Sequence, residues 1–388
     1  LLALPIWERL AQQEVEPSLR FQGSYQSAIH YDQLNDVSGA LVRYERVLNT
    51  TPTDQEQQEL LENSKLRFRA LRNQQFREDI AQLQQQQDWR GVDNLIRQNW
   101  EGRLIKVDDR LLNVWVGALQ NQKDWSGILN LYNELQRKES NKFESAADLI
   151  WQAEANESLN RPKEAITFYE RAIKKMAAGD ERFAAISNRL AVLYENGDDY
   201  QKQMKIYEEL YAQEKSPKFR QQYALKAGLI GLDKLQNKKL ASEWLQRADL
   251  GGVDDTDLRA SMLLIDIDRK DKDLDSALNR LKDLEKRFVP TNSNYFWQVP
   301  FQLGVLHQNR KEWSASRPYL EQVANQQQDT ELAEDAKQML RSVDSVIAKQ
   351  ELQNLLNGEN WKQVSNFISE QERLGNLPFS KEIFGIWV

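Results

Sequence analysis

The sequence predicts an all-α fold, an α-solenoid in which short helix–turn–helix units stack against one another. Apolar residues recur at spacings of three and four along most of the chain, which is the period of a half-buried helix. One such pattern returns at a nearly constant interval, and the 388 residues include only 16 glycines and 9 prolines. Because a short helical hairpin cannot bury its apolar face alone, repeated hairpins are expected to bury it against their neighbours.

The repeat unit is clearest in residues 188–217, where two apolar stripes of helical spacing flank a short polar run. The run 196–199 is expected to end the first helix, because Gly197 tolerates left-handed backbone angles and Asn and Asp side chains bind their own backbone. A second helix is expected from Tyr200. Pro217 is expected to close the unit.

Nine positions align as the first residue of a second helix. They are Val37, Trp89, Trp125, Pro162, Tyr200, Lys238, Leu274, Trp313 and Trp361. The successive intervals are 52, 36, 37, 38, 38, 36, 39 and 48 residues, so the middle six are nearly constant. The four tryptophans among these positions are expected to be buried, and replacing Trp125 with alanine is expected to cost about 3 to 5 kcal/mol through the cavity it leaves.

A small residue followed four positions later by a large one accompanies most of these helix starts. Three residues after the start, the side chain is small or aliphatic at Ala40, Val92, Ile128, Ala165, Ala241, Ala277, Ser316 and Val364. Seven residues after the start, it is large and apolar at Tyr44, Ile96, Tyr132, Tyr169, Tyr207, Leu245, Leu281, Leu320 and Ile368. This pairing predicts two closely packed helices, one residue permitting the approach and the other filling the space.

These residues resemble the tetratricopeptide repeat, a helix–turn–helix unit of about 34 residues. The match is best in residues 24–52, at Ala28, Tyr31, Ala40, Tyr44, Val47 and Pro52. The first-helix pattern returns at Leu190, Ala191 and Tyr194 and at Leu303, Gly304 and His307. Most units are two to five residues longer than the type repeat, and most lack its terminal proline. The resemblance implies a TPR-like α-solenoid, that is, a right-handed superhelix of repeats.

The predicted organisation has three parts. Residues 1–20 are expected to form an N-terminal capping segment, residues 21–375 a solenoid of about nine helical hairpins, and residues 376–388 a C-terminal tail. Longer helical insertions are expected near 54–88, as one long helix or two abutting helices, and near 328–360.

The pair Gly251-Gly252 is the only glycine pair in the chain. It is expected to lie either in an ordinary turn between repeats, with Thr256 or Asp257 capping the next helix, or in a hinge between two arms of the solenoid.

Composition and motifs argue against several classes of function. The net charge is −7 without a dense lysine and arginine run, so nucleic acid is a poor candidate ligand. There is no cysteine and only His30 and His307, and no phosphate-binding, zinc-protease or hydrolase motif occurs. The sequence therefore predicts a protein that is not an enzyme and has no metal or cofactor.

The resemblance implies that first helices line a concave binding face. The side chains expected there are Asn113, Gln120, Asn121, Asn188, Glu195, Asn196, Arg259, Asp266, Arg269, Gln308 and Asn309. Their amides offer both donors and acceptors, which suits an extended peptide or a helix. Phe296 and Trp297 are further candidates as exposed aromatics for binding.

The predicted function is a non-enzymatic scaffold that binds other proteins of a larger assembly, set in a bacterial cell-envelope machine for motility, secretion or surface-structure assembly. The alternative is the non-catalytic helical arm of an envelope protein that processes glycans or exports polysaccharide. Exposed tryptophans along a groove would favour glycan, whereas amides and charges favour peptide.

A periplasmic or envelope-associated location is expected, with the cytoplasm as the alternative. Residues 1–7 are apolar but too few to span a membrane, which takes about 20 residues. Membrane association is therefore expected only through a segment outside this chain.

Overall fold

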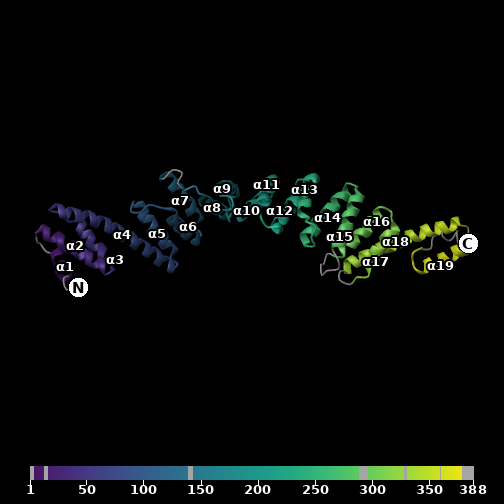
Figure 1. Ribbon diagram of the computed structural model, residues 1–388, viewed down its shortest axis with the longest axis horizontal. Helices are drawn as coiled ribbons and strands as arrows, with labels where there is room; N and C mark the ends of the chain where they lie inside the picture. Colours follow the sequence, from purple (N-terminus) through teal and green to yellow (C-terminus); the bar gives the residue numbers. More distant parts are fainter. Residues whose placement is uncertain are drawn as a thin grey trace. The chain divides into compact units, whose positions relative to one another are not determined.

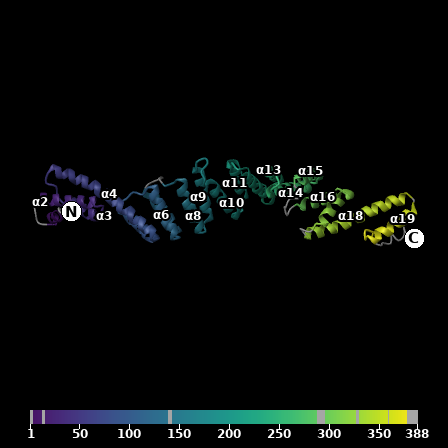
Figure 2. The same cartoon turned by 60° about the horizontal axis from the view of Figure 1, so that its bottom comes forward.

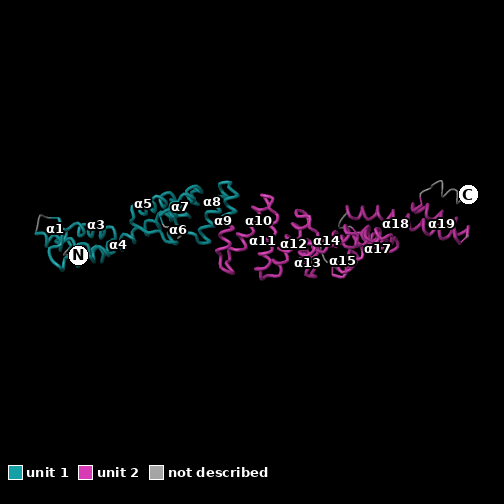
Figure 3. Tube along the Cα trace, turned by 90° about the horizontal axis from the view of Figure 1, so that it is seen from above, with its two compact units in different colours: residues 1–168 teal, residues 169–388 magenta. Residues whose placement is uncertain are grey.

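The computed structural model describes residues 4–12, 16–138, 143–287, 296–326, 330–358 and 360–377. Within these residues the chain forms helices joined by turns, and no strand occurs. It divides into two compact units, residues 1–168 and residues 169–388 (Figure 3). The division falls inside one helix, α9 (Pro162–Lys175). The predicted all-α fold is confirmed, whereas all but the first two residues of the predicted tail 376–388 lie outside the described residues.

The first unit contains eight further helices. They are α1 (Leu4–Gln12), α2 (Pro17–Gln33), α3 (Val37–Leu48), α4 (Gln55–Gln85), α5 (Trp89–Glu101), α6 (Asp109–Asn121), α7 (Trp125–Lys138) and α8 (Ala146–Ser158). Helices adjacent in the sequence lie side by side, as both views show (Figures 1 and 2).

The second unit continues the same succession of hairpins. Its helices are α10 (Phe183–Asn196), α11 (Tyr200–Gln213), α12 (Pro217–Leu229), α13 (Lys238–Ala248), α14 (Asp255–Lys270), α15 (Leu274–Arg287), α16 (Gln298–Asn309), α17 (Trp313–Ala324), α18 (Thr330–Asn357) and α19 (Trp361–Arg373). A π-helical turn, Ile230–Lys234, extends α12. The second neighbours α12 and α14, and α16 and α18, also touch, so each hairpin packs on the next.

The predicted repeat register is confirmed by the helix starts. Helices α3, α5, α7, α9, α11, α13, α15, α17 and α19 begin at the nine aligned residues. Every residue at the third and seventh positions after these starts is at most 7% exposed. In the unit that begins at Tyr200, the third position is Gln203, which is also buried. These two positions form the contact between the helices of each pair.

The four tryptophans at these helix starts are not buried, which corrects the prediction. Trp89, Trp125 and Trp313 are half-buried, and Trp361 is 61% exposed. A side chain in the first turn of a helix points back over the preceding turn, because the Cα–Cβ bonds tilt toward the helix N-terminus. It therefore covers the edge of the interface and does not enter it.

One turn geometry recurs between the helices of a pair. The residue two positions before the second helix has a left-handed backbone at Asn35, Gln87, Lys123, Asn160, Asp198, Gln236, Lys272 and Lys311, with φ between 49° and 63°. The next residue caps the second helix, and in most units it is Asp or Asn accepting a backbone N–H two or three residues on, as Asp88 accepts from Gly91 N at 2.8 Å. The cap satisfies one of the N–H groups that the first turn leaves without a partner.

Three details of the predicted turns were wrong. In the unit 188–217 the left-handed residue is Asp198, whereas Gly197 has φ −98°. Pro217 opens the next helix, where its missing N–H costs nothing, and does not close the preceding one. Asp254 caps α14 by accepting from the N–H groups of Thr256 and Asp257, so neither of these is the cap.

The glycine pair lies in a turn held by its flanking carboxylates. Buried Asp257 accepts from Leu250 N at 2.7 Å, and Asp249 accepts from Gly251 N at 3.1 Å. Gly251 has φ +77°, a conformation that a side chain would strain. Asp249 also pairs with Arg287 of α15 at 2.8 Å, which ties the turn to the following hairpin.

Two helices are much longer than the rest. Helix α4 has 31 residues and is continuous through the range 54–88, and α18 has 28 residues in the range 328–360. In the first unit, Leu61 and Leu71 of α4 belong to the core of α2 and α3, while Ile80 belongs to the core of α5 to α7. A single helix therefore joins two cores of the first unit.

Candidate partner-binding surfaces

A groove of about 600 Å³ lies in the first unit between α4, α6 and the loop that precedes α6. Its apolar lining consists of Phe76, Ile80, Leu104, Ile105, Leu111 and Val114. Leu104 is 47% exposed although it is a large apolar side chain. The groove is thus accessible, and polar residues share its lining with these apolar side chains.

The local sequence explains why the groove forms. Asp108 accepts from Leu111 N at 2.8 Å and so begins α6 only after the loop has turned. Arg103 takes a left-handed conformation, with φ 57°, at the end of α5, and Val107 is fully buried. These two points hold the loop against the core, so residues 104–106 lie along one side of the groove.

Three cations surround the apolar lining. Arg77, Lys106 and Arg110 line the groove and are exposed. Within the described part of the chain, none of the three forms an ion pair. One carboxylate, Asp108, also lines the groove and caps α6, while Asp79 accepts from Gln75, so the three cations outnumber the single carboxylate of the lining. The groove is therefore positively charged, although the whole chain carries a net charge of −7.

Gly117 of α6 lies on the helix face that carries Arg110 and Val114, since these positions are separated by seven and three residues. A Cβ added at Gly117 would meet no atom within 4 Å. At Gly228 and Gly304, also within helices, an added Cβ would come within 2.8 Å and 2.7 Å of a leucine on the adjacent helix. Close packing inside the chain thus explains those two glycines but not Gly117.

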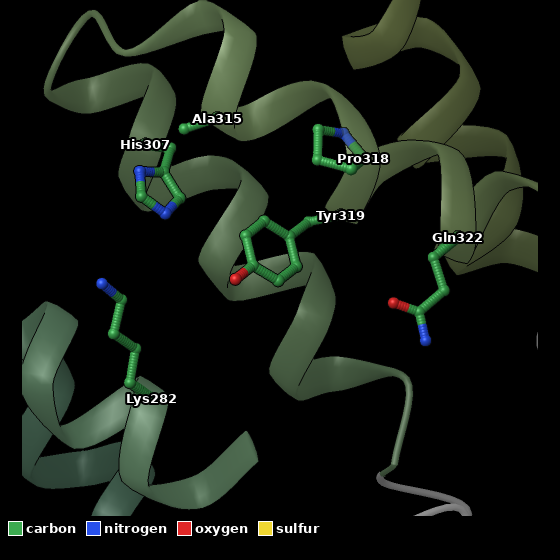
Figure 4. A pocket seen from close by; sticks show the side chains of 6 residues that line it. All are labelled: Lys282, His307, Ala315, Pro318, Tyr319 and Gln322. Carbon is green, nitrogen blue, oxygen red and sulfur yellow. The ribbon is translucent and has the colours of Figure 1, made fainter. Parts of the chain in front are cut away.

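A second pocket, of about 510 Å³, lies in the second unit between α15, α16 and α17. Lys282, His307 and Tyr319 reach toward the same space from these three helices (Figure 4). The imidazole of His307 stacks on the Tyr319 ring with centroids 5.6 Å apart. The pocket is shallow and open to solvent, and Lys282 at its edge is exposed.

Neighbouring groups determine the protonation of Glu312, beside this pocket, and of Tyr319, which lines it. Hydrogen bonds from Arg310 and from His307 hold the pKa of Glu312 below its ordinary value, so this carboxylate is ionised at neutral pH. An ionised carboxylate only accepts, and therefore His307 Nδ1 donates to Glu312 at 2.7 Å. Burial, together with the charge of Glu285, raises the pKa of Tyr319 and keeps its hydroxyl protonated. The pocket can donate from Lys282 and Tyr319 to a small anionic group.

Comparisons with known proteins show a likeness to helical repeat proteins. No protein-family model matches the chain, and no curated protein matches it. Solved structures do match in their succession of helical hairpins. The chain is similar to tetratricopeptide repeat proteins.

Three of these structures illustrate the likeness. YrrB, described as a TPR protein with an unusual peptide-binding site, has 20% identity and a TM-score of 0.35, over 53% of this chain and 97% of its own. The C-terminal part of a repeat protein from Cytophaga hutchinsonii has 11% identity and a TM-score of 0.36, over 71% and 98%. A tetratricopeptide repeat protein from Parabacteroides merdae has 16% and 0.29, over 76% and 97%.

The tetratricopeptide positions predicted for a concave face lie on the first helices of their hairpins. Asn113, Asn121, Glu195, Asn196, Arg259, Asp266 and Asn309 are exposed, and Gln120, Asn188, Arg269 and Gln308 are half-buried. None of the eleven lines the groove of α4 and α6 or the pocket of α15 to α17. Their role in binding stays a prediction.

Three of the predicted side chains already have hydrogen-bond partners inside the chain. Asn121 Nδ2 donates to Gly117 O and Asn188 Nδ2 to Ala184 O, each one helical turn back. Arg269 donates to Gln302 Oε1 of the next hairpin at 2.9 Å. These side chains support their own helices or the packing of neighbouring repeats.

Phe296 and Trp297 are not freely exposed, which corrects the expectation for these aromatics. Both are half-buried, and their rings form an edge-to-face pair with centroids 5.0 Å apart. Phe296 packs on the core of α14 to α16, and Trp297 packs on the core of α17 and α18. They lie at the start of α16, where they close the gap between two hairpins.

Sequence reasoning missed the groove of α4 and α6. Arg77 and Arg110 were visible as cations on two first helices, and Leu104 as one of three aliphatic residues in the loop before the second of them. That these residues share one surface depends on how α4 packs beside α6, which periodicity does not report.

Two other kinds of site do not occur in the part of the chain that the structure describes. Among these residues, no cluster of three His, Asp or Glu side chains could hold a metal ion. In the same residues, no helix is both long enough and apolar enough to cross a membrane.

Proposed function

We propose that the protein is a non-enzymatic scaffold that binds other proteins of a larger assembly. The observation that carries the proposal is the groove of α4 and α6, which combines apolar and polar lining residues with three cations that have no ion-pair partner among the described residues. A groove that combines apolar side chains with cations suits contact with a partner protein. The hairpin architecture supports the proposal, because stacked repeats present extended surfaces of this kind.

The groove favours a protein ligand over a glycan. Its apolar residues are aliphatic except for Phe76, so it offers no row of aromatic faces on which sugar rings could stack. Trp361, the most exposed of the tryptophans at the helix starts, lies in the second unit and not in this groove. A role as the helical arm of a glycan-processing or polysaccharide-export protein is therefore the weaker candidate.

The proposal includes a setting in a bacterial cell envelope, within a machine for motility, secretion or surface-structure assembly. The apolar character of residues 1–7 motivates this setting, and the absence of cysteine is compatible with it. Fractionation of the native cells tests it directly, since recovery of the protein with cytoplasmic markers alone would contradict it.

Site-specific photo-crosslinking in the native cells tests the scaffold itself. A photoreactive amino acid replaces Leu104 in the groove, and in a matched control it replaces Leu19 of α2, because both leucines are 47% exposed. We expect a discrete set of protein adducts from position 104 that position 19 does not form. The same adducts from both positions, or none from position 104, would refute the proposed function.

A further inference from the structure

We propose that the groove of α4 and α6 receives an acidic amphipathic helix of a partner protein. This inference rests on the proposed scaffold function and names the chemistry of the partner at that surface. Three features support this inference: the charge of the groove, the hydrogen-bonded backbone of its walls, and Gly117.

The charge of the groove selects an acidic ligand. Arg77 projects from α4, Arg110 from α6 and Lys106 from the loop, so cations flank the apolar lining on both sides. Within the described residues these three have no carboxylate partner of their own. A helix with an apolar stripe and acidic residues beside it would fit this surface. The stripe would contact the apolar lining, and the acidic residues would contact the cations.

The backbone of the groove favours a helix over an extended peptide. An extended segment needs hydrogen bonds for its own N–H and C=O groups when it is buried. The walls are the helices α4 and α6, whose backbone groups are already bonded within each helix. A helical ligand forms its backbone hydrogen bonds within itself, so it needs only side-chain contacts with the groove.

Gly117 gives such a helix room to approach. A glycine within a helix is unfavourable relative to alanine. A methyl group added at this glycine would have no atom within 4 Å, so packing inside the chain does not account for it, and Asn121 Nδ2 donates to its carbonyl at 2.8 Å. A residue without a side chain lets a partner's backbone come close. The open space beside Gly117 lies one turn beyond Val114, the last α6 residue that lines the groove.

The groove matches a helix of moderate length. Its α4 wall runs from Asn73 to Gln84, which corresponds to about 16 Å of helix axis. A ligand of about 14 residues would cover it with contacts at helical spacing.

A designed peptide tests the inference on the full chain. The probe is a fluorescein-labelled peptide of about 14 residues with leucines at helical spacing and glutamates elsewhere. Its comparators are a scrambled sequence of the same composition, a version with lysine in place of glutamate, and a version with proline at the centre. Fluorescence anisotropy measures Kd, and we expect the designed peptide to bind at least about tenfold more tightly than each comparator.

Three substitutions locate the binding. Arg77→Glu and Arg110→Glu should each raise Kd at least about fivefold, and more at low salt, because like charges then meet. Arg90→Glu is the matched control, since Arg90 of α5 is exposed, lies outside the groove and changes the net charge equally. Gly117→Leu should raise Kd at least about tenfold by filling the groove, while raising the melting temperature by about 2 °C because leucine favours the helix.

The outcomes separate this inference from the proposed function. Equal Kd values for Arg77→Glu, Arg110→Glu and Arg90→Glu would overturn the inference. So would unchanged binding by a folded Gly117→Leu protein, and circular dichroism establishes the folding. If Gly117→Leu does not fold, Gly117→Ala takes its place with a smaller expected loss. Specific adducts from position 104 without acidic-peptide binding would overturn the inference alone, whereas the absence of adducts would overturn the scaffold function.

Discussion

At the scale of single residues, the tryptophans show that residue type alone does not determine burial. Trp115 of α6 is fully buried, its Nε1 donates to Asp93 at 2.6 Å, and its ring meets Trp100 edge to face at 5.4 Å. Trp361 begins α19 and is 61% exposed. The difference follows from position, because Trp115 lies within α6 and contacts α5 through Asp93 and Trp100, whereas Trp361 is the first residue of α19.

Alanine substitutions should reproduce this difference in stability. Trp115→Ala is expected to lower the free energy of unfolding by about 4 kcal/mol, through a cavity and the loss of the hydrogen bond to Asp93. Trp361→Ala is expected to change it by less than about 0.5 kcal/mol. The expectation for Trp125→Ala falls to about 1 to 2 kcal/mol, because that side chain is half-buried. Native-state hydrogen exchange in the helices around each substitution measures the three local losses, and equal losses for Trp115→Ala and Trp361→Ala would contradict the assigned burial.

The carboxylate of Asp249 should make stability depend on pH. Burial opposes its ionisation, but hydrogen bonds from Arg287, Ser261 and the Gly251 N–H outweigh burial and hold the pKa of Asp249 below its ordinary 3.8. Its folded-state pKa is lowered, so its contribution is fully present above the unfolded-state pKa and is lost as pH falls through the folded-state pKa.

The variant Asp249→Asn measures this contribution. At pH 7 it should cost about 2 kcal/mol, the typical value of charge-assisted hydrogen bonds. The difference from the unsubstituted protein should shrink as pH falls below 3.8. A difference in melting temperature that stays constant between pH 7 and pH 3 would show that Asp249 does not act through its charge.

At the scale of elements, the recurring turn decides where each second helix begins. The left-handed residue reverses the chain, and the next residue caps the helix, so the pair of positions acts as one unit. Lysine occupies the left-handed position at Lys123, Lys272 and Lys311, although its side chain is unfavourable there. These turns consequently retain strain that glycine would remove.

Glycine should therefore have opposite effects in a turn and in a helix. Lys311→Gly is expected to stabilise the protein by up to about 1 kcal/mol, since the relief of a left-handed conformation exceeds the added chain entropy. Lys205→Gly, at an exposed position within α11, is expected to cost about 1 kcal/mol. Both residues lie in the second unit, so thermal melts compare them directly. A loss of stability in Lys311→Gly would argue against the assigned turn.

At the scale of the whole molecule, stability should be local. Each hairpin packs mainly on its neighbours, and the chain divides into two compact units. Repeat proteins of this kind unfold as a sum of local and neighbouring contributions, not as a single two-state unit.

Hydrogen exchange should reveal this division in one variant. Trp115→Ala is expected to speed amide exchange in α5, α6 and α7, whose cores contain or contact Trp115, and to leave α14 to α17 protected. Mass spectrometry of peptides from both units provides the measurement. Equal acceleration in both units would mean that the chain unfolds cooperatively.

Much of the architecture could be predicted from the sequence alone. Periodicity predicts the helical class, the helix starts and the buried third and seventh positions. One interface repeats at a nearly constant interval, so each repetition supports the same alignment of the units. The likeness to tetratricopeptide repeats rests on the same positions. Details of the turns were less predictable, since Asp198 rather than Gly197 took the left-handed conformation.

The sequence by itself determined the repeat register and the all-α class, because local hydrogen bonding and one repeating apolar pattern are encoded within each hairpin. Only the tertiary structure decided which surface is open. The groove brings Arg77, Leu104 and Arg110 together from two helices and a loop, and the empty space beside Gly117 depends on how those helices pack. Surface residues are not selected by periodicity, so their arrangement emerges only when the hairpins are placed together.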